Sequence, residues 1–350
     1  MRKNFKVGLV LLMAILMVFV AVGCQQSGSS EGAETKTSGS GSREVVKIIV
    51  PYGVGGTADA IGRKYAQIAN GLYPDYNFVV EQRTGGDGFV GAAYFESIDV
   101  NAKELLLFGY GNAYRHEFGN RFGTEQVPFD RANLKPLAAV DDRTWILYGK
   151  PGDTLEEVFE KARAGELRMS GGNPLSDPHL ALGSLVAVEG GSVTVVGYDG
   201  GAAQKLGLIN GEVSVFVGTT QAAMGEVEAG DLIPLLAFSE DSFDGLVGPD
   251  GPISVPGLVN DRHPELDPNT DYSGSILPAG GFVTARAGAD QAFVDKVIEI
   301  SKAVWATDEF KDWKEEIGLN HFEIYGDDAQ AYLDDAVERA VDAFELLNGN

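Results

Sequence analysis

Residues 44–59 predict the fold more directly than any other stretch: Glu44-Val45-Val46-Lys47-Ile48-Ile49-Val50-Pro51-Tyr52-Gly53-Val54-Gly55-Gly56-Thr57-Ala58-Asp59. The first seven residues are rich in Val and Ile, which predicts a strand that Pro51 ends. A glycine-rich loop follows. From Thr57 to Asn70 the apolar residues Ile61, Tyr65 and Ile68 recur at helical spacing. A strand, a glycine loop and a helix in this order are the beginning of a βαβ unit.

The same alternation continues along the chain on both sides of further glycine loops. Further strands are expected at 77–81, 105–108, 134–140, 144–148, 168–170, 193–196, 213–217 and 232–238. Helices are expected at 89–98, 154–164, 177 onward, 202–209, 222–229 and 327–347. This pattern predicts an α/β protein with mostly parallel sheets, and 350 residues suggest two domains. Residues 239–271 have no clear period and are interpreted as a functional loop or a decorated connection.

Five of the predicted strands run directly into small-residue loops that open helices, at 51–59, 84–88, 170–177, 198–202 and 216–220. Loops of this kind lie at the carboxyl edge of an open sheet, where ligands bind. Glycine lets backbone N–H groups approach a ligand, and a helix N-terminus favours an anion. Together the loops predict a cleft suited to a carboxylate. The candidate ligand-binding residues are Tyr52, Gly55, Gly56, Thr57, Asp59, Gly86, Asp87, Ser176, Asp177, His179, Tyr198, Asp199, Gly200, Gly201 and Thr219.

Each candidate also has an ordinary structural role open to it. A single glycine loop is most often only a turn, and the hydroxyls of Thr57, Ser176 and Thr219 can serve as helix caps. Tyr52 and Tyr198 can cover the apolar part of a ligand or belong to the packing. His179, near a helix start, can be a capping residue or a wall of the cleft.

The N-terminus has the organisation of an export signal. Arg2, Lys3 and Lys6 precede the apolar or small-residue run 7–23, and Ala21-Val22-Gly23-Cys24 resembles a bacterial lipobox. We expect residues 1–23 to be a signal peptide, Cys24 to be lipidated, and 24–43 to be a flexible linker rich in Ser and Gly. An uncleaved signal anchor with an incidental cysteine is the alternative. The body from residue 44 then lies outside the cell membrane.

Composition excludes several classes of protein. The formal net charge of −24 disfavours binding to nucleic acid, because phosphates would be repelled. The single cysteine excludes an intramolecular disulfide and any multi-cysteine metal site. No G-x-S-x-G elbow joins a predicted strand to a predicted helix, and the four histidines are dispersed without H-E-x-x-H spacing. No catalytic residue, cofactor or metal site is therefore predicted, and most acidic side chains are expected on the surface.

The order of these motifs resembles the Bug, or tripartite tricarboxylate transporter receptor, family of extracytoplasmic solute-binding proteins. Val46 to Asp59 resembles the family's opening strand, Pro-aromatic and Gly-Gly-Ser/Thr stretch. Glu81-Gln82-Arg83-Thr84-Gly85-Gly86 through Gly91-Ala92, and Gly171 to Leu180 with Pro178-His179-Leu180, are similar to its next signatures. Tyr198-Asp199-Gly200-Gly201, the strand in 211–217 and the hinge-like 230–234 continue the likeness, which covers about residues 44–347.

The resemblance implies a two-lobed periplasmic-binding-protein fold of type 2, the Venus flytrap, with a hinge. Lobe 1 would comprise 44–140 plus 238–350, and lobe 2 would comprise 141–237, with crossings near Val140 and Ala237. It also implies a small carboxylate or amino-acid-like ligand, two permease subunits as membrane partners, and a monomer. In the family the Tyr-x-Gly turn often carries Lys, but here it has Asp199, which can hold an amine if it faces the cleft. The stretch after Ser239 is also longer than usual.

The predicted function is therefore that of a lipid-anchored extracytoplasmic receptor, not an enzyme. It would capture a small carboxylate-type metabolite between two lobes and deliver it to a tripartite tricarboxylate-type secondary transporter. The alternatives are a ligand sensor for a signalling system and, less favoured, a secreted cleft enzyme on the same scaffold.

Overall fold

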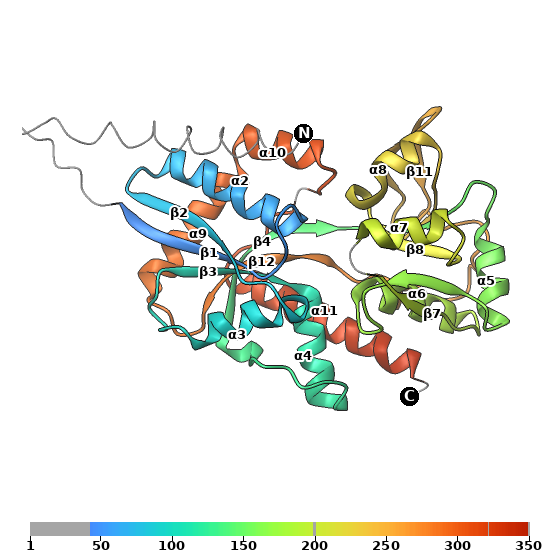
Figure 1. Cartoon of the computed structure of the whole chain (residues 1–350), viewed down its shortest axis with the longest axis horizontal. Coiled ribbons are helices and arrows are strands. Elements are labelled where there is room, and N and C mark those ends of the chain that lie inside the picture. Colours follow the sequence, from blue (N-terminus) through green and yellow to red (C-terminus); the bar gives the residue numbers. More distant parts are fainter. Residues whose placement is uncertain (1–42, 199–200, 321, 349–350) are drawn as a thin grey trace, which may run out of the picture. The chain divides into compact units, whose positions relative to one another are not determined.

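The computed structural model describes residues 43–198, 201–320 and 322–348. The predicted signal peptide, the lipidation site Cys24, almost all of the predicted linker, and the candidate residues Asp199 and Gly200 lie outside this part of the chain. The described residues form two five-stranded sheets with helices on both faces (Figure 1). The α/β class predicted from the strand–loop–helix alternation is confirmed.

The first sheet has the strand order β2-β1-β3-β12-β4. Its strands are β1 (Glu44–Val50), β2 (Tyr76–Gln82), β3 (Glu104–Gly109), β4 (Leu134–Arg143) and β12 (Ala279–Arg286). Ile48 and Val50 of β1 pack into one hydrophobic cluster and Ile49 packs into another. Because both faces of the strand are buried, its sequence is a continuous apolar run instead of an alternating one.

Six helices cover the two faces of this sheet (Figure 1). The cluster that contains Ile48 includes side chains of α2 (Thr57–Leu72), α9 (Gln291–Trp305) and α10 (Asp308–Glu316). The cluster that contains Ile49 includes side chains of α3 (Phe89–Ser97), α4 (Tyr110–Phe122) and α11 (Asp327–Leu347).

The second sheet has the order β7-β6-β8-β5-β9. Its strands are β5 (Trp145–Gly149), β6 (Arg168–Gly171), β7 (Thr194–Gly197), β8 (Val215–Thr219) and β9 (Ile233–Ala237). One face packs against α5 (Leu155–Arg163) and α6 (Asp177–Val188), and the other packs against α7 (Gly201–Ile209) and α8 (Thr220–Ala229). Thr154 and Glu157 form a reciprocal capping box at the start of α5.

In each sheet four strands run in the same direction and one runs against them, so the expectation of mostly parallel sheets is confirmed for strand direction, although both sheets are mixed. β12 runs antiparallel to β3 and β4, and β5 runs antiparallel to β8 and β9. Thr144 is the only residue between β4 and β5, so the chain passes from the first sheet to the second almost without a loop. It returns to the first sheet as β12. The predicted lobe boundaries near residues 140 and 237 stay predictions.

Residues 239–271, which show no period, contain a small hairpin of β10 (Phe243–Gly248) and β11 (Gly251–Val255). Leu246 and Val255 of the hairpin are buried in the cluster that includes Ala223 and Val227 of α8. The segment is therefore a decorated connection that extends the core of the second sheet. Short 3₁₀ helices occur at η1 (Gly86–Gly88), η2 (Arg131–Asn133) and η3 (Ser273–Ser275).

The C-terminal helix α11 packs against elements of both sheets. Phe344 of α11 stacks on Phe118 of α4 with a centroid distance of 4.7 Å. In the same last turn of α11, Cδ2 of Leu347 would lie 2.5 Å from a Cβ on Gly183 of α6, so the two helices touch where glycine has no side chain. This packing joins the cores of the two sheets into one cluster.

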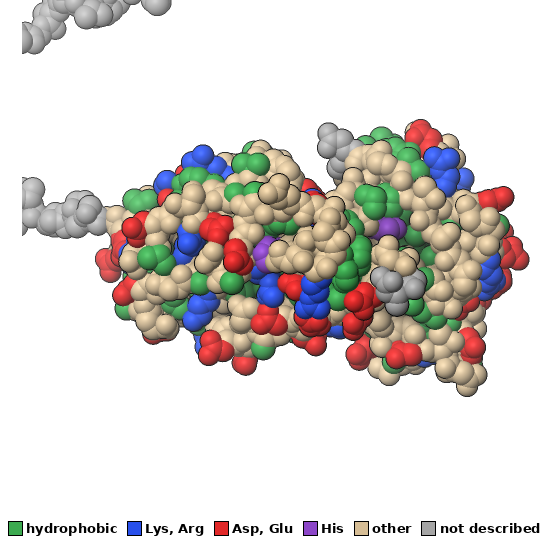
Figure 2. Space-filling view, turned by 90° about the horizontal axis from the view of Figure 1, so that it is seen from below, with side chains coloured by type: hydrophobic (Ala, Val, Ile, Leu, Met, Phe, Trp, Pro, Cys, Tyr) green, Lys and Arg blue, Asp and Glu red, His purple; other side chains and the backbone are tan. Residues whose placement is uncertain are grey.

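Acidic side chains are spread over the face shown in Figure 2, with basic side chains among them. Within the described part of the chain, the carboxylates that are buried are those of Asp59, 3% exposed, and Asp141, 1% exposed. No helix in the described ranges is long and apolar enough to cross a membrane.

We predict that Trp305→Ala lowers the free energy of unfolding by about 3–5 kcal/mol, because it removes a large buried ring. Trp305 is 2% exposed, packs edge-on against Tyr65 and stacks on Phe310. Its Nε1–H donates to the Ala139 carbonyl oxygen at 3.0 Å. Chemical denaturation of the full chain would measure the loss. Trp305→Phe keeps most of the packing and should cost less; equal stability of wild type and Trp305→Ala would contradict the packing described.

Candidate functional site

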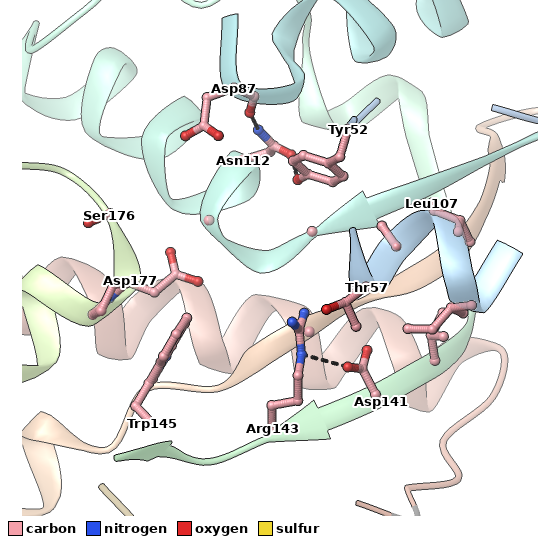
Figure 3. A pocket seen from close by; sticks show the side chains of 18 of the residues that line it. Tyr52, Thr57, Asp87, Leu107, Asn112, Asp141, Arg143, Trp145, Ser176 and Asp177 are labelled. Carbon is pink, nitrogen blue, oxygen red and sulfur yellow. Dashed lines mark hydrogen bonds and ion pairs between the residues drawn. The ribbon is translucent and has the colours of Figure 1, made fainter. Parts of the chain in front are cut away.

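A cavity of about 350 Å³ is lined by residues of both sheets and of the helices that follow their strands (Figure 3). This volume lies at the small end of the range for ligand pockets. The lining residues are Tyr52, Thr57, Ala58, Ile61, Asp87, Leu107, Gly109, Gly111, Asn112, Arg115, Val140, Asp141, Arg143, Trp145, Ser176, Asp177, Pro178, Gly280 and Gly281. Five of these residues carry charged side chains. The sequence predicted a cleft that binds through backbone N–H groups, but the cavity also presents charged side chains.

Arg143 and Asp141 form an ion pair at the end of β4, where the chain leaves the first sheet. Nε of Arg143 lies 2.6 Å from Oδ2 of Asp141. Burial raises the pKa of the Asp141 carboxyl, although Arg143, Lys314 and the N–H of Gly281 act in the opposite direction. The Nη groups of Arg143 have no hydrogen bond or ion pair within the described ranges, and Figure 3 shows the guanidinium pointing into the cavity. Arg143 therefore presents a positive charge to any ligand.

Asp177 enters the cavity from the first residue of α6, on the second sheet. Burial raises the pKa of its carboxyl to about 7; the nearby charge of Asp87 adds to this rise, whereas its own backbone N–H, Arg143 and Arg115 oppose it. The carboxylate lies against α4 of the first sheet: a Cβ on Gly111 would be 2.5 Å from Oδ1 of Asp177. No ion pair holds this carboxylate in the described part of the chain, and in Figure 3 it faces the cavity.

A hydrogen-bonded chain fixes the wall opposite Arg143. The hydroxyl of Tyr52 donates to Oδ1 of Asn112 at 2.5 Å, and Nδ2 of Asn112 donates to the carbonyl oxygen of Asp87 at 2.8 Å. Asp87 has a positive φ of 55°, which a non-glycine residue rarely adopts, so this bond holds a strained backbone. Its carboxylate lies 3.2 Å from Nη1 of Arg115.

Arg115 is held away from a ligand by its other contacts. It donates two hydrogen bonds to Glu125, at 2.7 and 2.6 Å, and its guanidinium lies 4.1 Å from the Phe89 ring centroid. A bidentate carboxylate partner of this kind orients the guanidinium. Of the two cationic lining residues, Arg143 is the one that remains available to a ligand.

Two hydrogen bonds join the sheets beside the cavity. Oγ1 of Thr57 donates to Oε1 of Gln221, in the first turn of α8, at 2.8 Å. Nδ2 of Asn173 donates to Oδ2 of Asp87 at 3.4 Å. Each bond connects a residue that follows a strand of the first sheet to one that follows a strand of the second, so both bonds would have to break if the sheets moved apart.

Of the predicted ligand-binding residues, five line this cavity: Tyr52, Thr57, Asp87, Ser176 and Asp177. Asp59 lies outside it. Oδ2 of Asp59 accepts from the Gly55 N–H at 2.9 Å, and Oδ1 accepts from Gln82 and pairs with Arg63. Burial acts to raise its pKa, but these partners leave the pKa below its usual value. The Asp59 carboxylate therefore stabilises the first glycine loop through local contacts and does not face the cavity.

The other predicted residues that the structure describes also lie outside the cavity. His179 donates from Nδ1 to the Pro174 carbonyl oxygen at 2.5 Å, and the Tyr198 hydroxyl donates to Glu212 at 2.7 Å. Gly56 and Thr219 are the N-cap residues of α2 and α8. Gly55, Gly86 and Gly201 complete the set that does not line the cavity.

The residues that the sequence did not reveal include Asn112, Arg115, Asp141, Arg143 and Trp145. They come from α4, β4 and β5, none of which follows one of the five glycine loops. A weak signal was present in the pair Gly280-Gly281. A Cβ on Gly281 would lie 2.6 Å from the Phe108 carbonyl oxygen, so β12 can pass beside β3 only with glycine there.

Metal binding finds no support in the described ranges, where no group of three or more His, Cys, Asp or Glu side chains is placed to hold an ion.

Comparison with known proteins gives a clear structural result. No family model matches the chain, and no curated protein matches its sequence. Rpa4515 of R. palustris, solved with adipate, is similar at 20% identity and a TM-score of 0.70, over 88% of this chain and 98% of that one.

Two further solved structures agree with it. A TctC solute-binding protein from Polaromonas has 18% identity and a TM-score of 0.64, over 88% of this chain and 99% of that one. MatC of Rhodopseudomonas palustris, with bound malate, has 14% identity and a TM-score of 0.66, over 87% and 99%. At such identities the likeness shows a shared fold. The chain thus has the two-lobed fold of periplasmic solute-binding proteins, and its structural neighbours include a TctC solute-binding protein and the periplasmic binding protein BugD.

Proposed function

We propose that this protein is an extracytoplasmic solute receptor of the TctC/Bug type, which captures a small carboxylate between its two lobes. The observation that carries the proposal is Arg143, whose guanidinium points into the cavity with its Nη groups unpaired in the described ranges. A guanidinium recognises a carboxylate through two parallel hydrogen bonds. The adipate and malate held by the structural neighbours support a ligand of this class.

Capture would follow from the arrangement of the two sheets around the cavity. Arg143 and Tyr52 belong to elements of the first sheet, whereas Ser176 and Asp177 belong to the second. A ligand that contacts both sets stabilises the form in which they are close, by as much as its affinities for the two forms differ. Hinge closure of this kind is common among periplasmic binding proteins. A lid and a catalytic centre are not needed for it.

Delivery and anchoring complete the proposal. The closed receptor would pass its ligand to the two permease subunits of a tripartite tricarboxylate-type secondary transporter, which the family resemblance implies. Lipidation of Cys24 would hold it at the outer side of the cell membrane, with the Ser- and Gly-rich residues 25–43 as a tether.

A sensor would bind the same ligand but associate with a signalling protein. Co-purification from membranes with two integral permease subunits would support transport; co-purification with a signalling protein would contradict it.

We predict that small carboxylates stabilise the full chain, purified in detergent, in a thermal-shift panel. A ligand at one hundred times its Kd adds about 2.7 kcal/mol to the stability of the folded form. Arg143→Gln should abolish the effect, because it removes the positive charge. If no small carboxylate or amino acid stabilises the chain while one is turned over into product, the receptor proposal fails.

Two variants make the Arg143 test specific. Arg143→Gln alone leaves the buried Asp141 carboxylate without its ion-pair partner, which destabilises the fold. Adding Asp141→Asn removes that charge, so the double variant should fold and still fail to bind. Arg163→Gln is the matched control, since Arg163 pairs with Glu156 and Glu189 outside the cavity. Unchanged binding by the folded double variant would exclude Arg143 from the site.

A separate prediction concerns the N-terminus. Cys24→Ser should release the protein from membranes, because the serine hydroxyl is not a substrate for thioether lipidation. Cell fractionation measures the distribution, and Ser27→Ala serves as the control that leaves it unchanged. Retention of Cys24→Ser in the membrane fraction would instead indicate an uncleaved signal anchor.

A further inference from the structure

The cavity holds two charged groups of opposite sign that each have hydrogen-bonding capacity left for a ligand. One is the Asp177 carboxylate, which has no ion pair in the described ranges, and the other is the pair of Nη groups of Arg143. The two groups reach the cavity from different sheets, at the start of α6 and the end of β4. Figure 3 shows both pointing into the same space. A ligand that touches both sheets therefore meets one positive and one negative group.

The charge balance of the lining argues against a ligand that is only anionic. Three carboxylates, those of Asp87, Asp141 and Asp177, face two guanidinium groups, those of Arg115 and Arg143. The Asp141 and Asp87 carboxylates already pair with Arg143 and Arg115, so Asp177 is the carboxylate in excess. A dicarboxylate would bring two more negative charges into a confined space. A charge partly withdrawn from water and without a partner is costly, and a ligand ammonium beside Asp177 would offset that cost.

Resting on the proposed function, we propose that the ligand is a short zwitterion: its carboxylate binds Arg143 and its protonated amine binds Asp177. The cavity is also lined by apolar side chains, among them Ile61, Leu107, Val140 and Trp145. These would pack against a short aliphatic segment. The ligand class is thus an amino acid, and Asp177 is the residue that selects it over a dicarboxylate of equal length.

Asp177 offers dicarboxylates one competing mode of binding. A protonated Asp177 could donate a hydrogen bond to the second carboxylate of the ligand. The two modes respond oppositely to pH, because an ammonium requires the ionised carboxylate and a dicarboxylate requires the protonated acid. The titratable and charged groups whose charges act on Asp177 are Tyr52, Asp87, Tyr114, Arg115 and Arg143, all from other elements; His179 lies on the same helix, hydrogen-bonded to the Pro174 carbonyl oxygen.

Binding should be measured by titration calorimetry on the full chain in detergent, with ligands paired by length. The pairs are β-alanine with succinate and 4-aminobutanoate with glutarate; each pair differs by an amine in place of one carboxylate. In the α-amino acid 2-aminobutanoate the amine and the carboxylate are on adjacent carbon atoms. It therefore tests whether binding requires a longer distance between these two groups. We expect at least one amino acid to bind about tenfold or more tightly than its dicarboxylate partner.

The variant Asp177→Asn should weaken the preferred amino acid about thirtyfold and remove or reverse the preference, because the amide cannot pair with an ammonium. Asp244→Asn is the matched control, since Asp244 is exposed on β10 and does not line the cavity. Circular dichroism verifies that both variants are folded. Should Asp177→Asn unfold, the length-matched preference of the wild-type chain still decides the matter.

The pH profile supplies an independent readout. With the pKa of Asp177 near 7, amino-acid affinity should fall about tenfold from pH 8 to pH 6 in wild type, and this dependence should vanish in Asp177→Asn. Dicarboxylates that bind best, with affinity rising as the pH falls, would overturn the zwitterion inference and leave the proposed function standing. If neither class binds at any pH, both proposals are overturned.

Discussion

The pairing of the buried Asp141 carboxylate constrains the centre of the molecule. Asp141 lies near the end of β4, almost entirely shielded from water, and a carboxylate in such a place must be neutralised or paired. Arg143, two residues later, supplies the nearest cation through Nε, and the N–H of Gly281 supplies a hydrogen bond. Using Nε for this purpose leaves the Nη side of the guanidinium directed into the cavity. The requirement of one buried acid thus places the cation that a ligand would meet.

The C-terminal helices α9 and α10 also contact the part of β4 that carries Asp141. Lys314 of α10, itself buried, donates to the Val140 carbonyl oxygen at 3.2 Å, and Trp305 of α9 donates to that of Ala139. Two polar groups from the C-terminal helices thus satisfy carbonyl oxygens of the strand that carries Asp141. With only Thr144 between β4 and β5, this supported segment is also the direct connection between the sheets. The contacts that stabilise the connection between β4 and β5 therefore also fix the positions of the cavity residues at the end of β4.

Much of the fold could be predicted because local patterns and tertiary structure agree. The run Val46–Val50 predicts β1, and the spacing of Ile61, Tyr65 and Ile68 predicts α2, as both were found. Helix α4 was missed although Tyr110, Tyr114 and Phe118 recur every four residues, because glycine and asparagine between them obscure the pattern. Strand β12 was missed for a similar reason: Gly280 and Gly281 are poor strand formers, and only close contacts with β3 and β4 explain them.

The sequence could predict which loops lie beside the cavity, but not which of their side chains point into it. Loops that follow parallel strands were identified, and Tyr52, Thr57, Asp87, Ser176 and Asp177 do line the cavity. Whether a loop residue faces outward or inward is set by tertiary contacts, as Asp59 and Tyr198 illustrate. Arg143 lies at the end of a strand, where nothing in the sequence separates a cavity-facing arginine from a solvated one.

The glycines at positions 109, 111, 280 and 281 have a consequence for how such receptors diverge. They make part of the cavity wall from main chain alone, at places where a side chain would collide with Tyr52, Asp177, Asp141 or Phe108. A wall of this kind keeps its shape when the side chains around it are exchanged. New specificity can then arise from one or two substitutions, at positions such as Arg143 or Asp177, without repacking of the core. The main chain thus sets the shape of the cavity, and the side chains set its selectivity.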